Sequence, residues 1–575
     1  MVPRENALLD QIDLVGRFLF IRFKLRSCRN EDSIMKKWLK LLTGGMTMTG
    51  MAVSVSACSN SSASTKYDKS LSWMTTSEIQ TLDQNKMVDT TSGEQADNVF
   101  EGLNRLDNQG KIKPGVATKS TASKDGKTWT FTLRKNAKWS NGDPVVAEDF
   151  VYSLQRMLDP RTRSQQQNIY QAVKNADAVV AGKVSPQKLG VEAKGKHTLV
   201  VHLTHPVPYF KMMTASTWDP VNKKAVQKYG KKYGTASKYM VYNGPFVSTG
   251  WTGTNLSWKL KKNNYYWDKK NVKLDTVNYS VQKTPSTDYN LYQSGKLDGA
   301  FLDTQASKQL KNQKGYRVFN LDRTEYLTYS LTNNKDLANA NLRRAVSMAL
   351  NRKVLAATVG GANTPATTFT GPQEMVNGKN FNKYFAQTNA TSQYTNYDKK
   401  ASQKLYAQAL KELGKSKVEF TLAGDDDDVS KKVMEYVQSQ LESTFGKKMV
   451  VNVKSMPKTT RVSNMLNGKY DVDFTGLTTS YNDPNSMLTT MKTGENYNFG
   501  KWSNKKFDQY LDASNDEMNP QKRLADLVKA EENLDNEQPL TPLYHDGQAW
   551  MVRENVHNLG FTAGNFNFRD TYVTK

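Results

Sequence analysis

The chain has 575 residues, too many for one hydrophobic core, so its length predicts two or three domains. A hydrophobic content of 37% is enough for globular cores but too low for a protein that crosses a membrane many times. With 80 basic against 55 acidic residues, the net charge of +25 favours anionic surroundings. Because acids are interspersed with the lysines and no basic-aromatic array occurs, we expect a solvated surface and no nucleic-acid partner.

Residues that build metal sites and catalytic centres are scarce. The only cysteines are Cys28 and Cys58, and the five histidines form neither an HExxH pattern nor a compact cluster. The sequence also lacks a GxSxG elbow with a following acid and histidine. We therefore predict a protein that is not an enzyme and holds no cofactor and no metal ion.

The first residues divide into an extension and a secretion signal. Residues 17–29 mix apolar and basic side chains and are too short and too charged to span a bilayer. At Met35 a Met-Lys-Lys start precedes an apolar, small-residue run over residues 41–57, which is typical of a signal peptide. We interpret residues 35–57 as that signal and residues 1–34 as an upstream extension of the reading frame.

The signal ends Val55-Ser56-Ala57-Cys58, which resembles the lipobox of bacterial lipoproteins. The resemblance implies cleavage before Cys58 and a lipid on its sulfur. Residues 58–66 are rich in serine, a composition that predicts a flexible tether. We therefore expect a lipid-anchored protein on the extracellular face of the cell membrane, in a Gram-positive bacterium.

Residues 125–160 contain the most informative pattern in the chain. Trp129, Phe131 and Leu133 alternate with threonines, which predicts a strand with one buried face. An Asn-Gly turn follows, and Asp143 is placed to cap a helix that begins at Pro144. Apolar residues four apart predict the buried face of this helix: Val146, Phe150, Leu154 and Leu158.

This strand, turn and helix closely resemble the signature of extracellular solute-binding proteins of family 5. That family comprises the oligopeptide-, dipeptide- and nickel-binding components of ABC importers. Further matches follow in the family's order: the Asn243-Gly244-Pro245 turn, the Asn263-Asn264-Tyr265-Tyr266-Trp267 segment and the Leu350-Asn351-Arg352 helix end. The resemblance covers residues 71–575.

The resemblance implies an α/β, bilobed periplasmic-binding-protein-like fold of class II, with two lobes joined by a hinge and the extra domain of peptide-binding proteins. Lobe I is assigned to residues 67–110, 237–322 and 538–575. The extra domain is assigned to residues 111–236, and lobe II to residues 323–537.

Periodicity predicts several further elements within these ranges. We expect a helical region over residues 162–181, a crossover between lobes at residues 326–332 and a helix from Asn341. Apolar residues at intervals of four predict a helix over residues 429–445, followed by a strand at residues 449–454. The acidic run over residues 425–428 lacks the spacing of a calcium loop and is interpreted as a helix-capping stretch.

The candidate ligand site lies in residues 476–484, which resemble the family's peptide-binding motif Gly-Trp-x-x-Asp-Tyr-x-[DE]-Pro. In that motif the first acid pairs with the α-amine of the ligand, but here Ser480 stands in its place and Leu477 replaces the tryptophan. Either another acid substitutes or the ligand has no free amine there. The resemblance gives these candidate ligand residues: Leu477, Thr478, Thr479, Ser480, Tyr481, Asp483, Tyr329 and Asn243.

The function implied by the resemblance is that of a lipid-anchored, monomeric receptor. It would capture peptides between two closing lobes and deliver them to the permease subunits of an ABC importer. Two alternatives remain open. One is a different ligand on the same fold, such as nickel, haem, an oligosaccharide or a signalling peptide. The other is a surface adhesin or wall-associated protein, suggested by the positive charge and the altered amine position.

Overall fold

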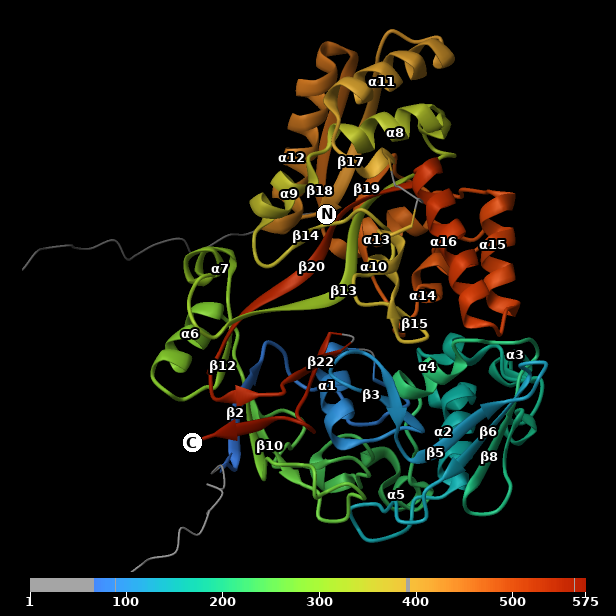
Figure 1. Cartoon of the computed structure of the whole chain (residues 1–575), viewed down its shortest axis with the longest axis vertical. Helices are drawn as coiled ribbons and strands as arrows, with labels where there is room; N and C mark the ends of the chain where they lie inside the picture. The colour runs from blue at the N-terminus through green and yellow to red at the C-terminus, as the bar shows by residue number, and fades with distance from the viewer. Residues whose placement is uncertain (1–66, 88, 389–392, 563) are drawn as a thin grey trace, which may run out of the picture. The chain divides into compact units, whose positions relative to one another are not determined.

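The computed structural model describes residues 67–87, 89–388, 393–562 and 564–575. The predictions for the upstream extension, the signal peptide, Cys58 and the tether concern residues outside this part of the chain. The described residues form two lobes, joined by a pair of long antiparallel strands (Figure 1).

The joining strands are β13 (Tyr316–Tyr329) and β20 (Leu540–Val552). Figure 1 shows them running side by side from the lobe that contains β12 to the lobe that contains β17 and β19. Their register shifts twice, and Asp322 at the first shift has a φ of 56°. Such irregularities bend a strand pair locally, which places a natural bending point between the lobes.

Two four-stranded sheets form the framework of the first lobe. One has the order β2-β11-β10-β9, with bounds Ser70–Thr75, Thr276–Val281, Ser257–Lys262 and Phe246–Thr249. The other has the order β5-β6-β8-β7, with bounds Ala117–Ala122, Thr128–Leu133, Thr198–His202 and Val191–Ala193. The strand predicted from Trp129, Phe131 and Leu133 is confirmed, and these three side chains are buried.

Helices and short strands cover these sheets. The helices are α1 (Thr90–Val99), α2 (Ala147–Leu158), α3 (Ala176–Val180), α4 (Phe210–Ser216), α5 (Lys223–Tyr229), α6 (Pro285–Gln293) and α7 (Thr304–Leu310). The short strands are β1 (Tyr67–Asp68), β3 (Asn104–Leu106), β4 (Ile112–Pro114), β21 (Val556–His557), β22 (Gly560–Thr562), β23 (Asn565–Asn567) and β24 (Tyr572–Thr574).

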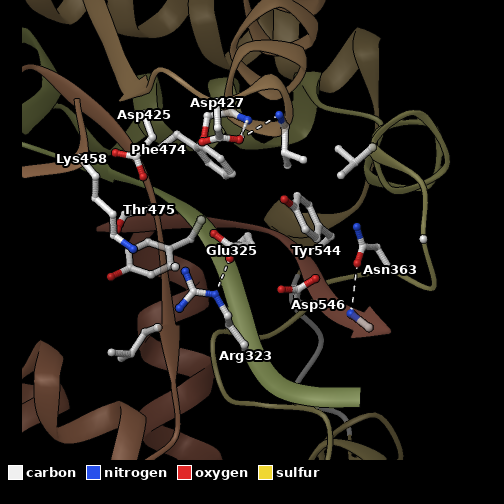
Figure 2. Close-up of a pocket in the computed structure, with 18 of the residues that line it drawn as sticks. Arg323, Glu325, Asn363, Asp425, Asp427, Lys458, Phe474, Thr475, Tyr544 and Asp546 are labelled. Atoms are coloured by element: carbon white, nitrogen blue, oxygen red, sulfur yellow. Dashed lines mark hydrogen bonds and ion pairs between the residues drawn. The ribbon is translucent and has the colours of Figure 1, made fainter. Parts of the chain in front are cut away.

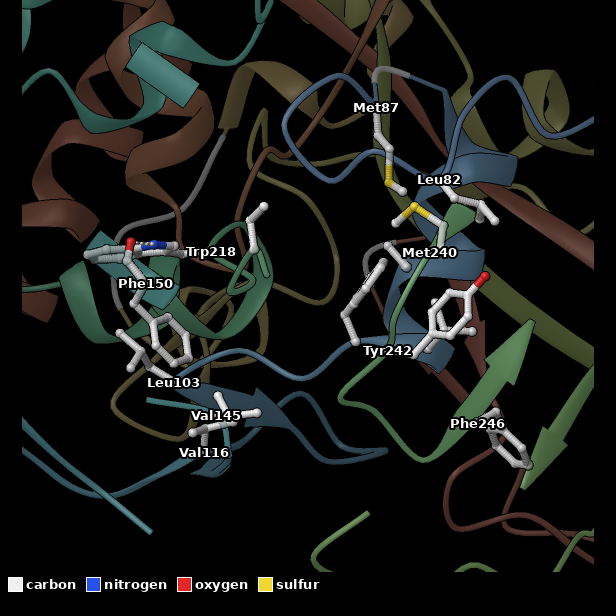
Figure 3. Close-up of a cluster of buried hydrophobic side chains, with 14 of the residues drawn as sticks. Leu82, Met87, Leu103, Val116, Val145, Phe150, Trp218, Met240, Tyr242 and Phe246 are labelled. Atoms are coloured by element: carbon white, nitrogen blue, oxygen red, sulfur yellow. Dashed lines mark hydrogen bonds between the residues drawn. The ribbon is translucent and has the colours of Figure 1, made fainter. Parts of the chain in front are cut away.

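One large core fills most of this lobe, and a small separate cluster that includes Leu302 and Met551 packs against α6 and α7. The large core includes buried side chains from residues 71–297 and 550–573, so the segment assigned to an extra domain shares its core with both flanking segments. Figure 3 shows part of it, where Phe150 of α2 meets the edge of Trp218 with ring centroids 6.4 Å apart. Burial of large aromatic side chains of this kind is a main source of stability.

The joining strands belong to a mixed sheet that extends from the first lobe into the second, with the order β12-β20-β13-β19-β17-β18, and β14 (Thr364–Pro365) also pairs with β20. The remaining bounds are β12 (Gly299–Phe301), β19 (Val472–Thr478), β17 (Val418–Asp425) and β18 (Met449–Met456). The strands β17 and β18 are parallel and are connected by α12 (Asp428–Phe445). The predicted helix and strand at residues 429–454 are therefore confirmed as a crossover unit.

Helices pack on both sides of this sheet, around cores formed by residues 326–544. They are α8 (Ala340–Ala349), α9 (Arg352–Val359), α10 (Phe381–Phe385), α11 (Lys399–Leu413), α13 (Lys458–Leu466), α14 (Asn485–Leu488), α15 (Lys505–Asp516) and α16 (Pro520–Glu537). A small hairpin joins β15 (Met375–Val376) to β16 (Lys379–Asn380). The helix expected from Asn341 is confirmed as α8.

The predicted start of the helix that follows the Asn-Gly turn is wrong. The helix expected to begin at Pro144, with Asp143 as its cap, begins at Ala147, because Pro144 forms an extended bridge with Lys138. The first turn is instead satisfied by Asp149, whose carboxylate accepts the Val146 amide at 2.9 Å.

The helical region expected over residues 162–181 consists of short pieces, of which the α-helical one is α3. Asn175 adopts a left-handed φ of 68° immediately before α3, which interrupts any continuous helix. The crossover expected at residues 326–332 is the final part of β13, a strand that begins ten residues earlier, at Tyr316, because residues 316–320 also pair with β20.

Candidate functional site

Strand β19 has an edge that is paired over only part of its length. On one side all of its residues pair with β13, from Val472 opposite Tyr329 to Thr478 opposite Arg323. On the other side β17 pairs only with Val472 and Asp473. Among the described strands, none covers residues 475–478 on that side. Their outward amides and carbonyls are therefore available to an added strand.

A cavity of about 930 Å³ opens beside this edge (Figure 2). Its lining includes Phe474, Thr475, Gly476 and Leu477 of β19, together with residues from β13, β20, α12 and α13. This volume is in the upper part of the range of small-molecule pockets, so the cavity can hold part of an extended chain with its side chains.

An ion pair lies above Gly476 in this cavity. The Arg323 Nε donates to Glu325 Oε1 at 2.5 Å, and Glu325 is the direct cross-strand partner of Gly476. A Cβ atom at position 476 would collide with the Arg323 guanidinium and with both Glu325 carboxylate oxygens. The absence of a side chain at Gly476 thus leaves room for this pair on the face of the sheet beside the unpaired edge.

Other acids line the same cavity, with different partners. Asp425 accepts from Arg461 Nε at 2.6 Å, and Asp427 caps α12 by accepting the Ser430 amide at 3.0 Å. The expected capping role of the acidic run is therefore confirmed for Asp427. Asp546 on β20 has no ion-pair partner among the described residues, and burial together with nearby Glu325 raises its pKa to about 6.

A second cavity of about 500 Å³ adjoins the residues that follow β19. It is lined by Thr479 and Ser480 and by acids and bases of the first lobe: Asp97, Glu101, Asp219, Arg105 and Arg569. Tyr497 lines both cavities, so the two spaces lie along one path past the end of β19.

The acids of the second cavity differ in their hydrogen-bond and ion-pair partners. Glu101 accepts hydrogen bonds from Tyr266 and Trp267, and Asp97 accepts from the Asn565 amide at 2.8 Å. Asp219 has no ion-pair partner within the described part of the chain. Burial, reinforced by Asp97 and Glu101, raises its pKa to about 8. A positive ligand group would relieve this repulsion.

The structure brings some of the predicted site residues to these cavities. Leu477 lines the first cavity, whereas Thr479 and Ser480 line the second. Thr478 between them is exposed, and its hydroxyl accepts from Arg323 Nη1 at 3.3 Å. The Ser480 amide donates to Ser486 Oγ at 2.7 Å, so the backbone of the motif is held by its own turn.

Tyr481 is half-buried and Asp483 is buried, and neither residue lines either cavity. Asp483 accepts from both terminal nitrogens of Arg523, at 2.6 and 2.8 Å, and both side chains are 4% exposed. A carboxylate engaged in this way has no free oxygen directed at a ligand amine. The ligand roles predicted for Tyr481 and Asp483 stay predictions, although Asp483 has a clear structural partner.

Tyr329 and Asn243 lie in the interior. The Tyr329 hydroxyl is within 2.7 Å of Thr541 Oγ1 and its side chain is fully buried. The Asn243 amide group accepts from the Glu101 amide at 3.1 Å and donates to the Glu101 carbonyl at 2.8 Å. Neither residue lines either cavity, so their predicted contact with a ligand stays a prediction and the structure shows them as packing residues.

Sequence reasoning did not single out several charged residues of the site. They are Arg323, Glu325 and Asp546 in the first cavity, and Asp97 and Asp219 in the second. Strand pairing and chain reversal bring them together from distant segments, so no local spacing marks them. Two of these acids adjoin an aromatic residue in the sequence, Glu325 before Tyr326 and Asp219 after Trp218, but such a pair does not by itself indicate a site.

No three histidine, cysteine, aspartate or glutamate side chains of the described residues are grouped so that they could hold a metal ion. Within the same residues, no helix combines the length and the apolar character needed to cross a bilayer.

Two lobes joined by paired strands, with ligand-sized cavities beside an unpaired strand edge, define the class of two-lobed solute-binding proteins. The family model described as bacterial extracellular solute-binding proteins, family 5 Middle, matches residues 111–499. The chain belongs to this family, as its sequence motifs predicted.

Known relatives agree over nearly the whole chain. A dipeptide-binding protein of Lactococcus lactis subsp. cremoris is 33% identical over 530 residues, which cover 88% of this chain and 95% of the relative. The solved structure of Listeria monocytogenes OppA bound to peptide is similar as well, with 32% sequence identity and a TM-score of 0.68. The match covers 88% of this chain and 99% of the Listeria chain.

The substrate-binding domain of an oligopeptide ABC transporter from Bacillus anthracis is also similar. Its sequence is 35% identical and the TM-score is 0.69. The match covers 89% of this chain and 100% of the Bacillus anthracis chain. The predicted fold class, a bilobed periplasmic-binding-protein-like fold of class II with the extra domain, is confirmed by these likenesses.

Proposed function

We propose that this protein is a receptor for peptides, which it holds in an extended conformation along residues 475–478 of β19 and delivers to the permease subunits of an ABC importer. The observation that supports this most directly is the unpaired edge of β19, which opens into the first cavity. The names of similar proteins, a dipeptide-binding protein and an OppA bound to peptide, point to the same class of ligand.

The geometry suits a receptor with broad specificity. Backbone hydrogen bonds from an added strand give affinity whatever the side chains are. Side chains that project into solvated cavities are accommodated through water and are only loosely selected. If the lobes close on bending of β13 and β20, the peptide stabilises the closed form only to the extent that it contacts both lobes.

The second cavity is the proposed site for the free amine of the peptide. Ser480 offers no negative charge, and an unpaired ammonium would be poorly stabilised in a half-buried site. Asp219 and Asp97 supply carboxylates in the same cavity as Ser480. We therefore assign the role of the missing motif carboxylate to Asp219, with Asp97 beside it.

The proposal includes a lipid anchor at Cys58, which would keep a monomeric receptor at the extracellular face of a Gram-positive membrane, close to its permease. The lipobox in the sequence supports this assignment. Cys58→Ala should leave the precursor uncleaved and without lipid, which intact-mass spectrometry of membrane and medium fractions would reveal. An unchanged mature mass and unchanged membrane attachment would contradict the anchor.

Identification of ligand that copurifies with the protein tests the function as a whole. Native mass spectrometry followed by sequencing should find a mixture of short peptides, and calorimetry should measure binding of alanine pentapeptides. Haem, nickel or an oligosaccharide in their place would favour another ligand on this fold. Binding to isolated cell walls in the absence of any bound peptide would favour the adhesin.

A further inference from the structure

We infer that the first cavity selects peptides with a cationic side chain, lysine or arginine, which Glu325 and Asp546 hold above β19. This inference rests on the proposed function, because it assumes a peptide on the unpaired edge. It adds the class of side chain that this receptor prefers.

The position of Glu325 is the first observation. Its carboxylate lies over Gly476, on the strand whose edge is open. A peptide strand added at that edge would lie about 4.8 Å from β19. The extended side chain of lysine or arginine is longer than this spacing. A cationic group from the peptide can therefore reach the Glu325 carboxylate across Gly476.

The balance of charge is the second observation. Five acids line the cavity against three bases, in a chain whose net charge is +25. Asp425 pairs with Arg461, and Asp427 is engaged as a helix cap. Asp303 is also a helix cap, and Lys458 lies on α13, away from strands β13 and β20, on which Glu325 and Asp546 face Arg323 alone. These two strands therefore bring two negative charges against one positive charge. One additional cation balances the group.

The contacts of Asp546 support the same conclusion. It follows His545 on β20, the strand next to the one that carries Glu325, and Figure 2 shows both carboxylates in the cavity, with Arg323 below Glu325. Burial raises the pKa of Asp546, and repulsion from the nearby Glu325 carboxylate raises it further. An ammonium or guanidinium group placed here would reduce this repulsion, whereas a carboxylate would increase it.

The walls of the cavity fit the aliphatic part of such a side chain. Phe474, Tyr326 and Tyr544 lie around the acids, with Leu477 at the unpaired edge. Lysine and arginine carry methylene stems that pack on apolar and aromatic surfaces while the charged end remains paired. Aromatic rings close to the cation also attract it directly.

The test compares lysine with norleucine, which has the same stem without the charge. Alanine pentapeptides with one lysine at each position in turn, and their norleucine counterparts, are titrated into the purified protein by calorimetry. At the position that faces Gly476, lysine should bind roughly tenfold to a hundredfold more tightly than norleucine, as expected for a charge-assisted hydrogen bond. Arginine should show the same advantage over citrulline.

Variants then locate the effect. Asp546→Asn should reduce the lysine advantage several-fold, and Glu325→Gln should reduce it further. The matched control Asp177→Asn removes an exposed carboxylate on α3, outside both cavities, and should leave the advantage unchanged. Circular dichroism would verify folding, and the wild-type comparison stands even where a variant does not fold.

The possible failures can be told apart. Equal affinities for lysine and norleucine peptides at every position would overturn this inference and leave the peptide receptor intact. A lysine advantage that survives both Asp546→Asn and Glu325→Gln would overturn the assignment to this cavity. Failure of every pentapeptide to bind would contradict the proposed function itself and this inference with it.

Discussion

Tyr209 stacks on Tyr481 with the two rings nearly parallel: the ring centroids are 5.3 Å apart and the ring planes form an angle of 3°. This contact joins the segment that follows β8 to the segment that follows β19, two parts of the chain that lie 272 residues apart. The guanidinium of Arg523 lies 5.2 Å from the Tyr209 ring while it pairs with Asp483. Aromatic and ionic contacts therefore hold residues 481–483 of the candidate ligand segment in place.

The stack should contribute measurably to stability. Tyr481→Phe keeps both rings and should cost little, whereas Tyr481→Ala should reduce the free energy of unfolding by about 3–5 kcal/mol, as large aromatic truncations do. Urea denaturation of both variants measures this difference. A loss of similar size in Tyr481→Phe would show that the hydroxyl, hydrogen-bonded by the Asn485 amide at 3.3 Å, contributes more than the stacked ring.

Asp219 should determine how strongly the free amine is recognised. Asp219→Asn should weaken the binding of a free-amine peptide by roughly tenfold or more, because a charge-assisted hydrogen bond is lost. The affinity for the N-acetylated form of the same peptide should stay nearly unchanged. Ser480→Asp should strengthen the binding of the free-amine peptide, since it adds a carboxylate to the same cavity. Calorimetry on the two peptide forms with each variant checks both expectations.

Equal affinities for the free-amine and N-acetylated peptides in the wild type would contradict an amine site in this cavity. Asp512→Asn is a suitable control, because it removes an exposed acid that does not line either cavity.

Amine binding should release protons. The pKa of Asp219 is raised to about 8 by burial and by Asp97 and Glu101, so near neutral pH the free protein holds this carboxyl largely protonated. A bound ammonium favours the ionised form, and a proton must leave. The raised pKa also means that the stability this group contributes is present at low pH and is lost as the pH rises through about 8.

Calorimetry in buffers of different ionisation enthalpy counts these protons. Release near pH 7 that approaches about one proton per free-amine peptide, and that disappears at higher pH, is the expected result. Asp219→Asn should abolish most of it. Release that persists unchanged in Asp219→Asn would assign the proton to another group.

Local patterns in the sequence predicted much of the fold. Alternation around Phe131 and intervals of four from Val433 to Leu441 indicate strands and helices because each periodicity corresponds to one buried face. The same reasoning failed at Pro144, where a bridge to Lys138 keeps the backbone extended. Tertiary pairing of this kind is not visible in a local pattern.

Of the candidate site, only the part that a motif marks could be predicted from the sequence. Leu477, Thr479 and Ser480 lie in the segment that resembles the family motif, and the structure places them on the cavities. Glu325 and Asp546 come together because β13 pairs with β20, and Asp219 approaches Asp97 through packing within the first lobe. Such proximity depends on contacts between distant segments, which a single sequence does not specify.

The most direct measurement is an amide-methylation scan of a bound peptide. In a strand added to β19, only every second peptide residue directs its amide toward residues 475–478, and each backbone hydrogen bond lost should weaken binding about three- to tenfold. Methylation at successive positions should therefore give an alternating pattern of weak and strong binding by calorimetry. Equal losses at all positions, or none at any, would contradict a peptide held on the unpaired edge of β19.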